Sequence, residues 1–543
     1  MPKMTGSQAV ARSLEREGVK LVFGLPGAQL MGILDALYEQ PDIRFITVRH
    51  EQSTTFMADG YARVKGKPGI ALVVPGPGVQ NASAGLTTAY SVSSPVLLLA
   101  GQVESHMLGQ DKGALHEIND QLDLVRPVTK WCRRVLKVEE IPDAIHEAMK
   151  QMKTGRPRPT EIEIPPDVLA SRAEVKLLEP EEYPPLAPNR EQVSRAADLL
   201  IAAKKPLLWA GGGVIAADSS RELTALAEEQ GIPVATTAEG KGAIPEDHAL
   251  SLGAAYHGIG ATAWAAPNAD ILLAVGTRFS RQMSGATKAC APQRLIHIDA
   301  DAAVIGKNYP AEIAIVADAK AALQMLLKEL RKKARPSERW PVADLEGFRT
   351  NNQKYLEANA PLQREIIGEM QKALPDDSIL VSGITNVAYW SYFAYRVKRP
   401  RAYLTASYAA TLGFAFPTAL GAKMAAPEKP VVSISGDGGF MYALPELATA
   451  VKYGINVIAL VFVDNAFGAS LNDQRTRYGG RLFGTDLYNP SFAQVAEVFG
   501  AKGIKVEPEN IGKALEQALE TPRPTVIEVP IPTLAPPFQM QKG

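Results

Sequence analysis

Hydrophobic and polar positions alternate in a regular way between Val431 and Gly468. A strand-like run, VVSIS, is followed by the glycine-rich turn Gly436–Gly439, by a segment with helical spacing of apolar residues, and by a second apolar run, VIALVFV. Short apolar runs bounded by turn residues are typical of buried strands, and two of them around one helix predict a parallel βαβ unit. The acidic residues Asp437 and Asp464 stand where the two predicted strands end.

The same alternation of strand-like and helix-like segments recurs along the rest of the chain. Two polar, proline-rich stretches interrupt it, Leu178–Arg190 and Arg331–Trp340. Clustered prolines do not continue a helix and favour extended linkers. We therefore predict an α/β protein with three doubly wound parallel-sheet domains, at 1–178, 190–330 and 355–533.

The central domain has one rival interpretation. Gly211–Gly213 follows the strand-like run that starts at Pro206, as in dinucleotide-binding folds. A complete spaced glycine fingerprint is missing, so we interpret these glycines as a structural turn.

Composition fits a large soluble enzyme. The 543 residues include 58 basic and 58 acidic side chains, without a polybasic tail or an acidic run, which argues against nucleic acid and anionic membranes as partners. No apolar stretch reaches membrane-spanning length, and the N-terminus has the pattern of an amphipathic helix instead of a signal core, so we expect a cytoplasmic location. Cys132 and Cys290 lack the spacing of a zinc site or a disulfide framework.

The two acidic residues suggest a specific chemistry. Carboxyl ends of neighbouring parallel strands meet at one edge of a sheet, so Asp437 and Asp464 can converge on one hard cation. Glycines beside Asp437 let backbone N–H groups approach a phosphate closely. These residues predict a site for a magnesium diphosphate, with an ordinary surface turn as the alternative.

The segment also resembles the thiamine diphosphate signature, which begins with Gly-Asp-Gly and ends about one βαβ unit later in a metal-binding Asn. The resemblance implies that Asp437 ligates Mg²⁺ and that Gly438 and Gly439 lie against the diphosphate of the cofactor.

The second metal ligand departs from the family pattern. Counted without gaps from Gly468, Asp464 stands where the family usually has the Asn, and the backbone carbonyl of Ala466 is then the next ligand. Asp464 keeps an oxygen donor and adds one negative charge. Asn465 is the alternative ligand if the strand is shifted by one residue.

A second informative pattern lies in the first segment. The predicted strand Phe45–Val48 ends just before Glu51, at the start of a helix-like segment. From the residues alone, Glu51 can be a helix cap as well as a functional acid. The region resembles the pyrimidine-binding domain of thiamine diphosphate enzymes in GLPGAQL, PGPGVQNASAG and SSPVLLLAGQ. The resemblance implies that Glu51 hydrogen-bonds the aminopyrimidine ring and is catalytic.

Two further segments resemble the family's cofactor site. In TASYAATLGFAFPTALGAK, the match implies that Leu412 wedges between the two cofactor rings and that the backbone oxygen of Ala410 accepts a bond from the 4′-amino group. In SGITNVAYW, it implies that Thr385 and Asn386 contact the diphosphate. Core packing of the leucine and a helix N-cap at Thr-Asn are the alternatives.

The resemblance also implies an assembly. Glu51 and Asp437 belong to different segments, and family members bring these two positions together across a two-fold interface. We therefore expect an obligate homodimer, paired into a homotetramer, and an inactive monomer.

The likeness is closest to acetolactate synthases and extends over nearly the full chain. It implies decarboxylation of a 2-oxo acid such as pyruvate and ligation to a second carbonyl compound. Arg281 then corresponds to an arginine that binds the acceptor carboxylate, and His116 replaces the usual glutamine as an acid/base or hydrogen-bond donor. Gln29 faces the substrate end. A solvated arginine and a structural imidazole are the alternatives.

Departures from the synthase pattern keep other activities open. Asp473 stands where the synthases have a Trp that selects the second substrate. Ala238 and Glu239 stand where flavin-binding members have apolar residues, which disfavours FAD. The run GASL, which ends at Leu471 near the substrate, also resembles benzaldehyde lyase. A lyase or decarboxylase of the benzaldehyde lyase or benzoylformate decarboxylase type, acting on aldehydes or 2-oxo acids without ligation, is therefore the alternative.

A third hypothesis is a flavin-dependent oxidase or a non-catalytic relative, because a fold alone does not prove a function. The presence of Glu51, Asp437 and Leu412 argues against a relative without chemistry. The C-terminal PTLAPPFQMQKG fits either a lid over the site or a mobile tail.

Overall fold

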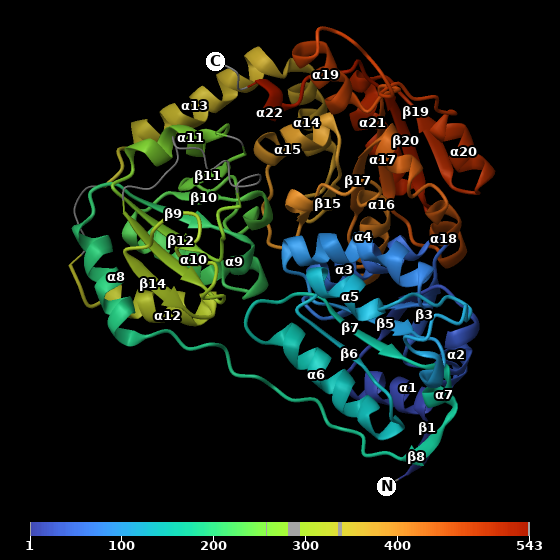
Figure 1. Cartoon of the computed structure of the whole chain (residues 1–543). Helices are drawn as coiled ribbons and strands as arrows, with labels where there is room; N and C mark the ends of the chain where they lie inside the picture. The colour runs from blue at the N-terminus through green and yellow to red at the C-terminus, as the bar shows by residue number, and fades with distance from the viewer. Residues whose placement is uncertain (1, 257, 281–293, 335–338, 541–543) are drawn as a thin grey trace.

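The computed structural model describes residues 2–256, 258–280, 294–334 and 339–540. It contains three six-stranded parallel sheets flanked by helices, which confirms the predicted fold class (Figure 1). The N-terminal domain, blue, and the C-terminal domain, orange to red, pack on each other, and the central domain, green to yellow, lies beside them. The domain boundaries at 1–178, 190–330 and 355–533 stay a prediction.

The N-terminal sheet has the strand order β3-β2-β4-β5-β7-β6. Helix α1 begins with a capping box, in which the Thr5 hydroxyl accepts from the Gln8 N–H at 3.1 Å and the Gln8 side chain accepts from the Thr5 N–H. The strands are β1 (Lys3–Thr5), β2 (Leu21–Gly24), β3 (Arg44–Thr47), β4 (Gly69–Val73), β5 (Val96–Gly101), β6 (Trp131–Arg134), β7 (Thr160–Ile164) and β8 (Arg172–Glu174). The helices are α1 (Gly6–Arg16), α2 (Met31–Tyr38), α3 (Glu51–Lys65), α4 (Pro77–Val92), α5 (Gln121–Val125), α6 (Ile141–Lys153) and α7 (Pro166–Ala170).

The central sheet has the order β11-β10-β9-β12-β13-β14, so the strand order reverses beside β9. A Cβ on Gly211 would lie 2.2 Å from the Gly276 carbonyl oxygen, so the glycine run lets two loops touch, in keeping with a structural turn. The strands are β9 (Pro206–Ala210), β10 (Val234–Thr236), β11 (Ser251–Ala254), β12 (Ile271–Val275), β13 (Leu295–Asp299) and β14 (Ile313–Val316). The helices are α8 (Arg190–Ala202), α9 (Gly212–Ala216), α10 (Ser220–Gln230), α11 (Ala261–Ala265), α12 (Ala319–Leu330) and α13 (Val342–Asn359).

The C-terminal sheet has the order β16-β15-β17-β18-β20-β19. Its strands are β15 (Ile379–Ser382), β16 (Tyr403–Thr405), β17 (Val431–Gly436), β18 (Ile458–Val463), β19 (Lys502–Lys505) and β20 (Thr525–Pro530). Its helices are α14 (Pro361–Ala373), α15 (Asn386–Ala394), α16 (Ala415–Ala425), α17 (Asp437–Met441), α18 (Glu446–Tyr453), α19 (Gly468–Arg477), α20 (Phe492–Val498), α21 (Ile511–Glu520) and α22 (Pro537–Met540).

The connection between β17 and β18 differs from the single helix that we predict. The two strands pair in parallel, as expected, but two short helices, α17 and α18, join them. Pro445 stands at the start of α18, and because proline has no N–H it cannot continue a helix from the preceding turn. The predicted turn is also shorter, since α17 begins at Asp437 itself.

The N-terminal and C-terminal domains share one hydrophobic core, where helices α3 and α16 cross. A Cβ on Gly60 would lie 2.0 Å from the Thr418 carbonyl oxygen, and one on Gly421 would lie 1.9 Å from that of Met57. Only glycine permits this approach. The crossing fixes the start of α3 relative to the C-terminal sheet.

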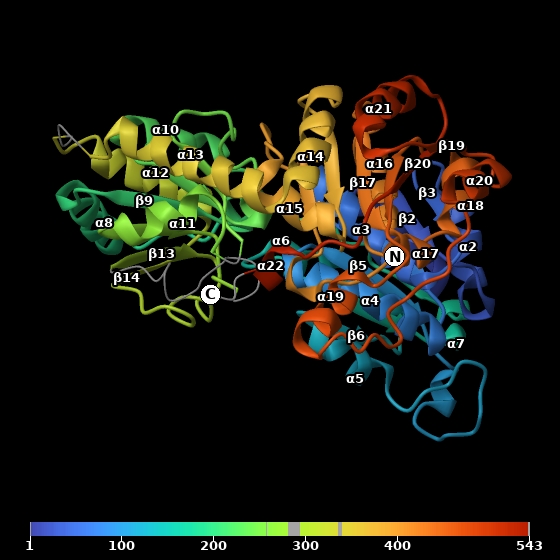
Figure 2. The ribbon, with the colours of Figure 1, turned by 90° about the horizontal axis from the view of Figure 1, so that it is seen from above.

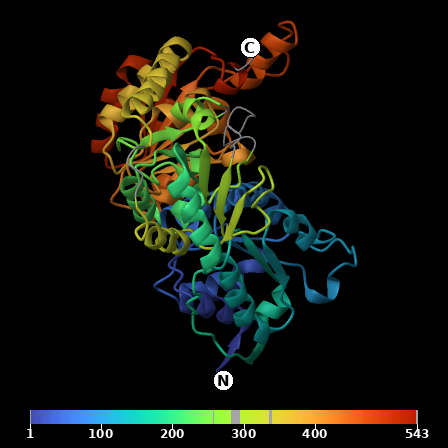
Figure 3. The same ribbon diagram turned by 90° about the vertical axis from the view of Figure 1, so that its left-hand side faces the viewer.

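The segment Leu178–Arg190 contains neither strand nor helix before α8, and it runs as an extended linker along the edge of the molecule (Figure 1). Part of the second predicted linker lies outside the described residues. The loop between β5 and α5 projects from the N-terminal domain in two perpendicular views (Figures 2 and 3). Among the described helices, none combines the length and apolar character that crossing a membrane requires.

Candidate active site

A cavity of about 290 Å³ opens at the carboxyl edge of the C-terminal sheet. All of its lining residues come from the C-terminal domain. The lining brings together most of the predicted cofactor and metal residues, namely Thr385, Asn386, Leu412, Asp437, Gly438, Gly439, Asp464 and Ala466.

Asp437 lies at the end of β17 with only 2% of its surface exposed. Its Oδ1 accepts from the Gly438 N–H at 2.8 Å, and its Oδ2 accepts from the Asn465 N–H at 2.7 Å and from the Asn489 side chain at 2.9 Å. Burial raises the pKa of Asp437, and these hydrogen bonds oppose the rise. The carboxylate is thus fixed in one orientation toward the end of β18.

Asp464 follows β18 and lines the same cavity. Burial and the neighbouring Asp437 raise the pKa of Asp464 to about 6, against hydrogen bonds from Ala466 and Thr533. Two carboxylates that repel each other beside a cavity fit a hard divalent cation, which relieves the repulsion. No group of three or more His, Cys, Asp or Glu suited to a metal occurs among the described residues, so further ligands at such a site would be backbone or cofactor oxygens.

Glycines keep the cavity open. A Cβ on Gly438 would lie 2.8 Å from the Phe467 ring, and one on Gly468 would lie 2.5 Å from Oδ2 of Asp464. Larger side chains at these positions would therefore displace residues that line the cavity. The donor set and the space available both fit a diphosphate with its cation.

Several predicted residues lie outside the cavity lining. Asn465, the alternative ligand, is exposed, has a positive φ of 52° and does not line the cavity. Ala410 is exposed with a φ of 48°, and Leu471 is buried within α19. Neither of them is part of the lining. Arg281 lies outside the described residues.

Glu51 is the first residue of α3, in the N-terminal domain. Its Oε2 accepts from the Asn81 side chain of α4 at 3.0 Å, and it does not line the cavity. The backbone before it is held by Glu446, which is 1% exposed and accepts from the N–H groups of Arg49 and His50 at 3.0 and 3.1 Å. A buried carboxylate of the C-terminal domain thus anchors the start of α3.

Gln29 and His116 lie together, a contact that the sequence does not predict. The Gln29 side chain donates to the Leu115 carbonyl oxygen at 3.0 Å, and its Oε1 lies 3.3 Å from Nδ1 of His116. His116 has a positive φ of 67°, which is uncommon outside glycine. His116 belongs to the projecting loop between β5 and α5, and Gln29 lies in the short turn between β2 and α2.

The C-terminal segment, which the sequence leaves open as a lid or a mobile tail, lies against the cavity. Leu534 and Pro536 line it, the Asn386 side chain donates to the Leu534 carbonyl oxygen at 2.9 Å, and the Phe538 ring stacks edge-on against Tyr389 at 5.2 Å. The tail is therefore docked over the cavity, and the proline-rich composition alone did not distinguish a lid from a mobile end. Sequence reasoning missed Asn489, because nothing in its local sequence indicates a contact with Asp437.

Comparisons with known proteins agree with this geometry. Three sequence models match in order: thiamine pyrophosphate enzyme, N-terminal TPP binding domain, over residues 4–124, the central domain over 193–326, and the C-terminal TPP binding domain over 383–529. The "Probable acetolactate synthase large subunit" of Methanocaldococcus jannaschii is 36% identical over 97% of this chain and 92% of its own length. The chain belongs to the thiamine pyrophosphate enzyme family. It is therefore a thiamine diphosphate-dependent enzyme, and this confirms the predicted resemblance.

Other relatives of the same name extend over similar lengths. "Acetolactate synthase isozyme 3 large subunit" of Escherichia coli is 33% identical over 96% of this chain and 93% of its own length. "Acetolactate synthase large subunit IlvB1" of Mycobacterium tuberculosis is 36% identical over 94% of this chain and 85% of its own length. The likeness thus includes all three domains of this family member.

Proposed function

We propose that the chain decarboxylates a 2-oxo acid such as pyruvate and ligates the remaining fragment to a second carbonyl compound, as the names of its relatives indicate for them. The observation that carries the proposal is the cavity in which Asp437, Asp464 and the glycines of α17 meet. The likeness to acetolactate synthases over nearly the whole chain favours ligation over simple decarboxylation.

Magnesium would be held by the carboxylates of Asp437 and Asp464 and by the backbone oxygen of Ala466. Support comes from the raised pKa of Asp464 and from the position of all three residues on one cavity. Asn465 would not ligate the metal through its exposed side chain. Its backbone N–H donates a hydrogen bond to Asp437 and so helps to orient that carboxylate. Oxygen ligands of this kind suit Mg²⁺, which also binds substrate phosphates.

The diphosphate would lie against Gly438, Gly439, Thr385 and Asn386, and Leu412 would support the cofactor rings. When bound, thiamine diphosphate supplies the carbon nucleophile that attacks the carbonyl group of the substrate. Ala410 would accept a hydrogen bond through its backbone oxygen. Glu51 would share a proton with a pyrimidine nitrogen of the cofactor. In this role its carboxyl group would act as a general acid–base catalyst.

Glu51 would reach the cofactor from a second copy of the chain. The support is that the cavity lining includes no residue of the N-terminal domain, while Glu51 points to Asn81 of its own domain. A two-fold interface would create two equivalent sites, so we propose a homodimer as the smallest active form, with pairing into a homotetramer.

Complementation between inactive variants tests this assembly. Glu51→Gln and Asp437→Asn are each expected to lack activity, but a mixed dimer contains one site with both defects and one intact site. Mixed refolding should restore about a quarter of wild-type activity if sites form between copies. No restoration above the level of the separate variants would place Glu51 and Asp437 of one site in the same chain.

Gln29 and His116 would contact the substrate. Gln29, before α2, and His116, on the projecting loop, form a polar pair, in which His116 can donate a hydrogen bond to the substrate or exchange a proton with it. Arg281 and Leu471 stay candidates for acceptor recognition on the resemblance alone. Small 2-oxo acids and aldehydes are the proposed substrates, and the cytoplasm is the proposed compartment.

We propose that FAD is not a cofactor. The central domain borders a second cavity, of about 240 Å³, and Glu239 is one of its lining residues. Its carboxylate pairs with Arg63 at 2.7 Å and with the Thr405 hydroxyl, and burial raises the pKa of Glu239. An apolar flavin ring would have to lie against this polar group. A visible flavin absorption spectrum in protein purified with added FAD would contradict this part of the proposal.

The activity itself is tested by product identification. Purified protein is incubated with Mg²⁺, thiamine diphosphate and pairs of 2-oxo acids and aldehydes, and the products are identified by NMR. We expect a hydroxyketone or hydroxyketo acid together with carbon dioxide. Release of free aldehyde without a coupled product would instead support the lyase or decarboxylase alternative.

A further inference from the structure

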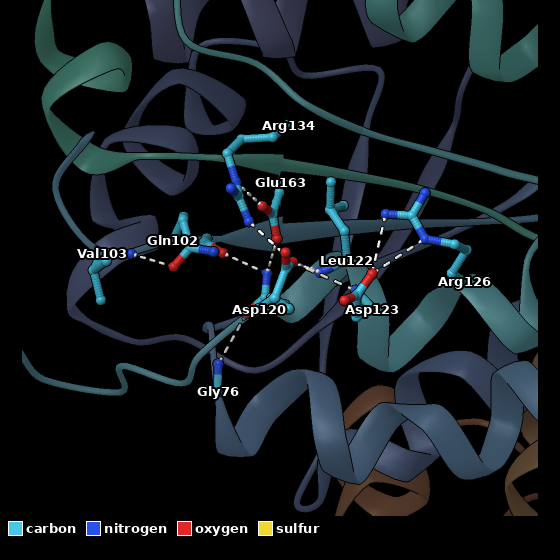
Figure 4. Close-up of polar contacts among 11 residues, drawn as sticks. Gly76, Gln102, Val103, Asp120, Leu122, Asp123, Arg126, Arg134 and Glu163 are labelled. Atoms are coloured by element: carbon cyan, nitrogen blue, oxygen red, sulfur yellow. Dashed lines mark hydrogen bonds and ion pairs between the residues drawn. The ribbon is translucent and has the colours of Figure 1, made fainter. Parts of the chain in front are cut away.

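Gln121, the first residue of α5, is fully buried and joins three elements of the N-terminal domain. Its Nε2 donates to the carbonyl oxygen of Gly101 at 3.1 Å and to Oε2 of Glu163 at 2.8 Å, and its Oε1 accepts from the N–H of Gly76 at 2.9 Å. These partners lie at the ends of β5 and β7 and just before α4. Figure 4 shows Glu163 and Gly76 among the residues of this polar network.

Glu163 fixes the orientation of the Gln121 amide. Its carboxylate is fully buried and accepts from Nε of Arg134, which also contacts Asp120 at 3.3 Å (Figure 4). Burial raises the pKa of Glu163, and the neighbouring Arg134 opposes the rise. An ionised carboxylate only accepts hydrogen bonds, so the amide NH₂ must face Glu163 and the amide oxygen must face Gly76.

Gly76 in turn determines where His116 lies. It has a φ of 58° and a ψ of −109°, and a Cβ at this position would lie 2.3 Å from the His116 carbonyl oxygen. The His116 backbone therefore rests directly on Gly76. Gln121 follows His116 by only five positions. The buried amide of Gln121 therefore holds both Gly76, against which the His116 backbone packs, and the end of the loop that carries His116.

We propose that Gln121, oriented by Glu163, is a positioning residue for the reaction. It holds Gly76 and the loop that carries His116, and through them it places the Gln29–His116 pair toward the substrate. It does not itself touch substrate or cofactor. This inference rests on the proposed function for the role of His116, but the placement of the loop can be measured without any activity.

Gln121→Glu is the sharpest perturbation, because Glu keeps the size of the side chain and still accepts from Gly76. Two facing carboxyl groups can remain bonded only while they share a proton. The charged groups around the pair are Arg134 of β6, Asp120 at the start of α5, and Glu161 on the same strand as Glu163. As pH rises and the proton is lost, repulsion should move the loop.

We expect the ratio of variant to wild-type kcat/KM to fall as pH rises, by about 10- to 100-fold at the alkaline end, because small displacements of catalytic groups reduce turnover strongly. Affinity for thiamine diphosphate with Mg²⁺ should stay unchanged. Hydrogen exchange of residues 102–120 should accelerate over the same pH range, without substrate present. The double variant Gln121→Glu with Glu163→Gln again places one amide opposite one carboxylate. It should recover the wild-type pH dependence of kcat/KM and the wild-type exchange rates of the loop.

Gln110→Glu is the matched control, since Gln110 is exposed in the same loop and its side chain donates to the His106 carbonyl oxygen. The inference is overturned if Gln121→Glu keeps the wild-type pH profile and exchange rates, or if it loses cofactor affinity in parallel with turnover. If Gln121→Glu does not fold, Glu163→Gln alone should accelerate exchange of the loop, and unchanged exchange overturns the inference. Absence of ligation by wild-type protein would refute the proposed function only, since the exchange measurement still reports on loop placement.

Discussion

Replacing Glu161 by Leu should stabilise the protein, increasingly so as pH rises. Glu161 lies on β7 in register with Leu98 of β5 and Cys132 of β6, on a face that packs into the core shared by the N-terminal and C-terminal domains. Its side chain is fully buried, and neither carboxyl oxygen has a hydrogen-bond partner among the described residues. Burial, with the nearby Glu163, raises its pKa well above 4.5, in spite of Arg134.

The magnitude follows from proton linkage. Above the usual glutamate pKa the unfolded chain releases this proton while the folded chain keeps it, so the folded state binds one more proton. Stability then falls by about 1.4 kcal/mol per pH unit between the unfolded and folded pKa values. The unpaired carboxyl group adds about 1–3 kcal/mol that does not depend on pH.

Urea unfolding and thermal melts of wild type and Glu161→Leu across this pH range test the reasoning. If the N-terminal domain unfolds as one unit, the difference in apparent Tm should widen by about 3–5 °C for each pH unit between the unfolded and folded pKa values. Glu39→Leu makes the same change at an exposed position and should show no such trend. Parallel stability curves for wild type and Glu161→Leu would refute the assignment of Glu161 as a buried acid with a raised pKa.

Three further predictions concern the site. Glu51→Gln should bind thiamine diphosphate with wild-type affinity, measured by fluorescence quenching, but lose most turnover; normal turnover with cofactor bound would remove Glu51 from the mechanism. Asp464→Asn should raise the Tm of metal-free protein above pH 6, because burial and Asp437 destabilise the ionised form of Asp464, whose pKa is raised to about 6. This variant should keep Mg²⁺-dependent cofactor binding. A lower Tm would contradict the repulsion between the two carboxylates. Phe538→Ala should speed cofactor release in stopped-flow dilution by loosening the tail from Tyr389, and an unchanged rate would exclude a closing role for the tail.

Hydrophobic patterning predicted the architecture because each buried strand and each amphipathic helix has a local, periodic pattern of apolar residues. The βαβ unit around Asp437 has the expected strands, β17 and β18, and the expected parallel pairing. The single crossover helix was wrong, since the effect of Pro445 on helix continuity was not weighed. The core shared by two domains at the α3–α16 crossing depends on glycines that let distant segments pack closely. Such close packing leaves no periodic pattern in the sequence.

The sequence predicted those residues of the candidate site that belong to a recognisable motif and also lie at the carboxyl edge of the C-terminal sheet. Asp437, Asp464 and Leu412 fall on one cavity because parallel strands end at a common edge. Glu446 and Asn489 were not predictable, since their partners, the backbone before Glu51 and the carboxylate of Asp437, are set by tertiary contacts.

Calorimetric titration of thiamine diphosphate into metal-free protein, with and without added Mg²⁺, tests the central claim most directly. We predict saturable binding that requires the cation and that is lost in Asp437→Asn. Equal binding without any divalent metal, or undiminished Mg²⁺-dependent binding in Asp437→Asn, would contradict the account of the site.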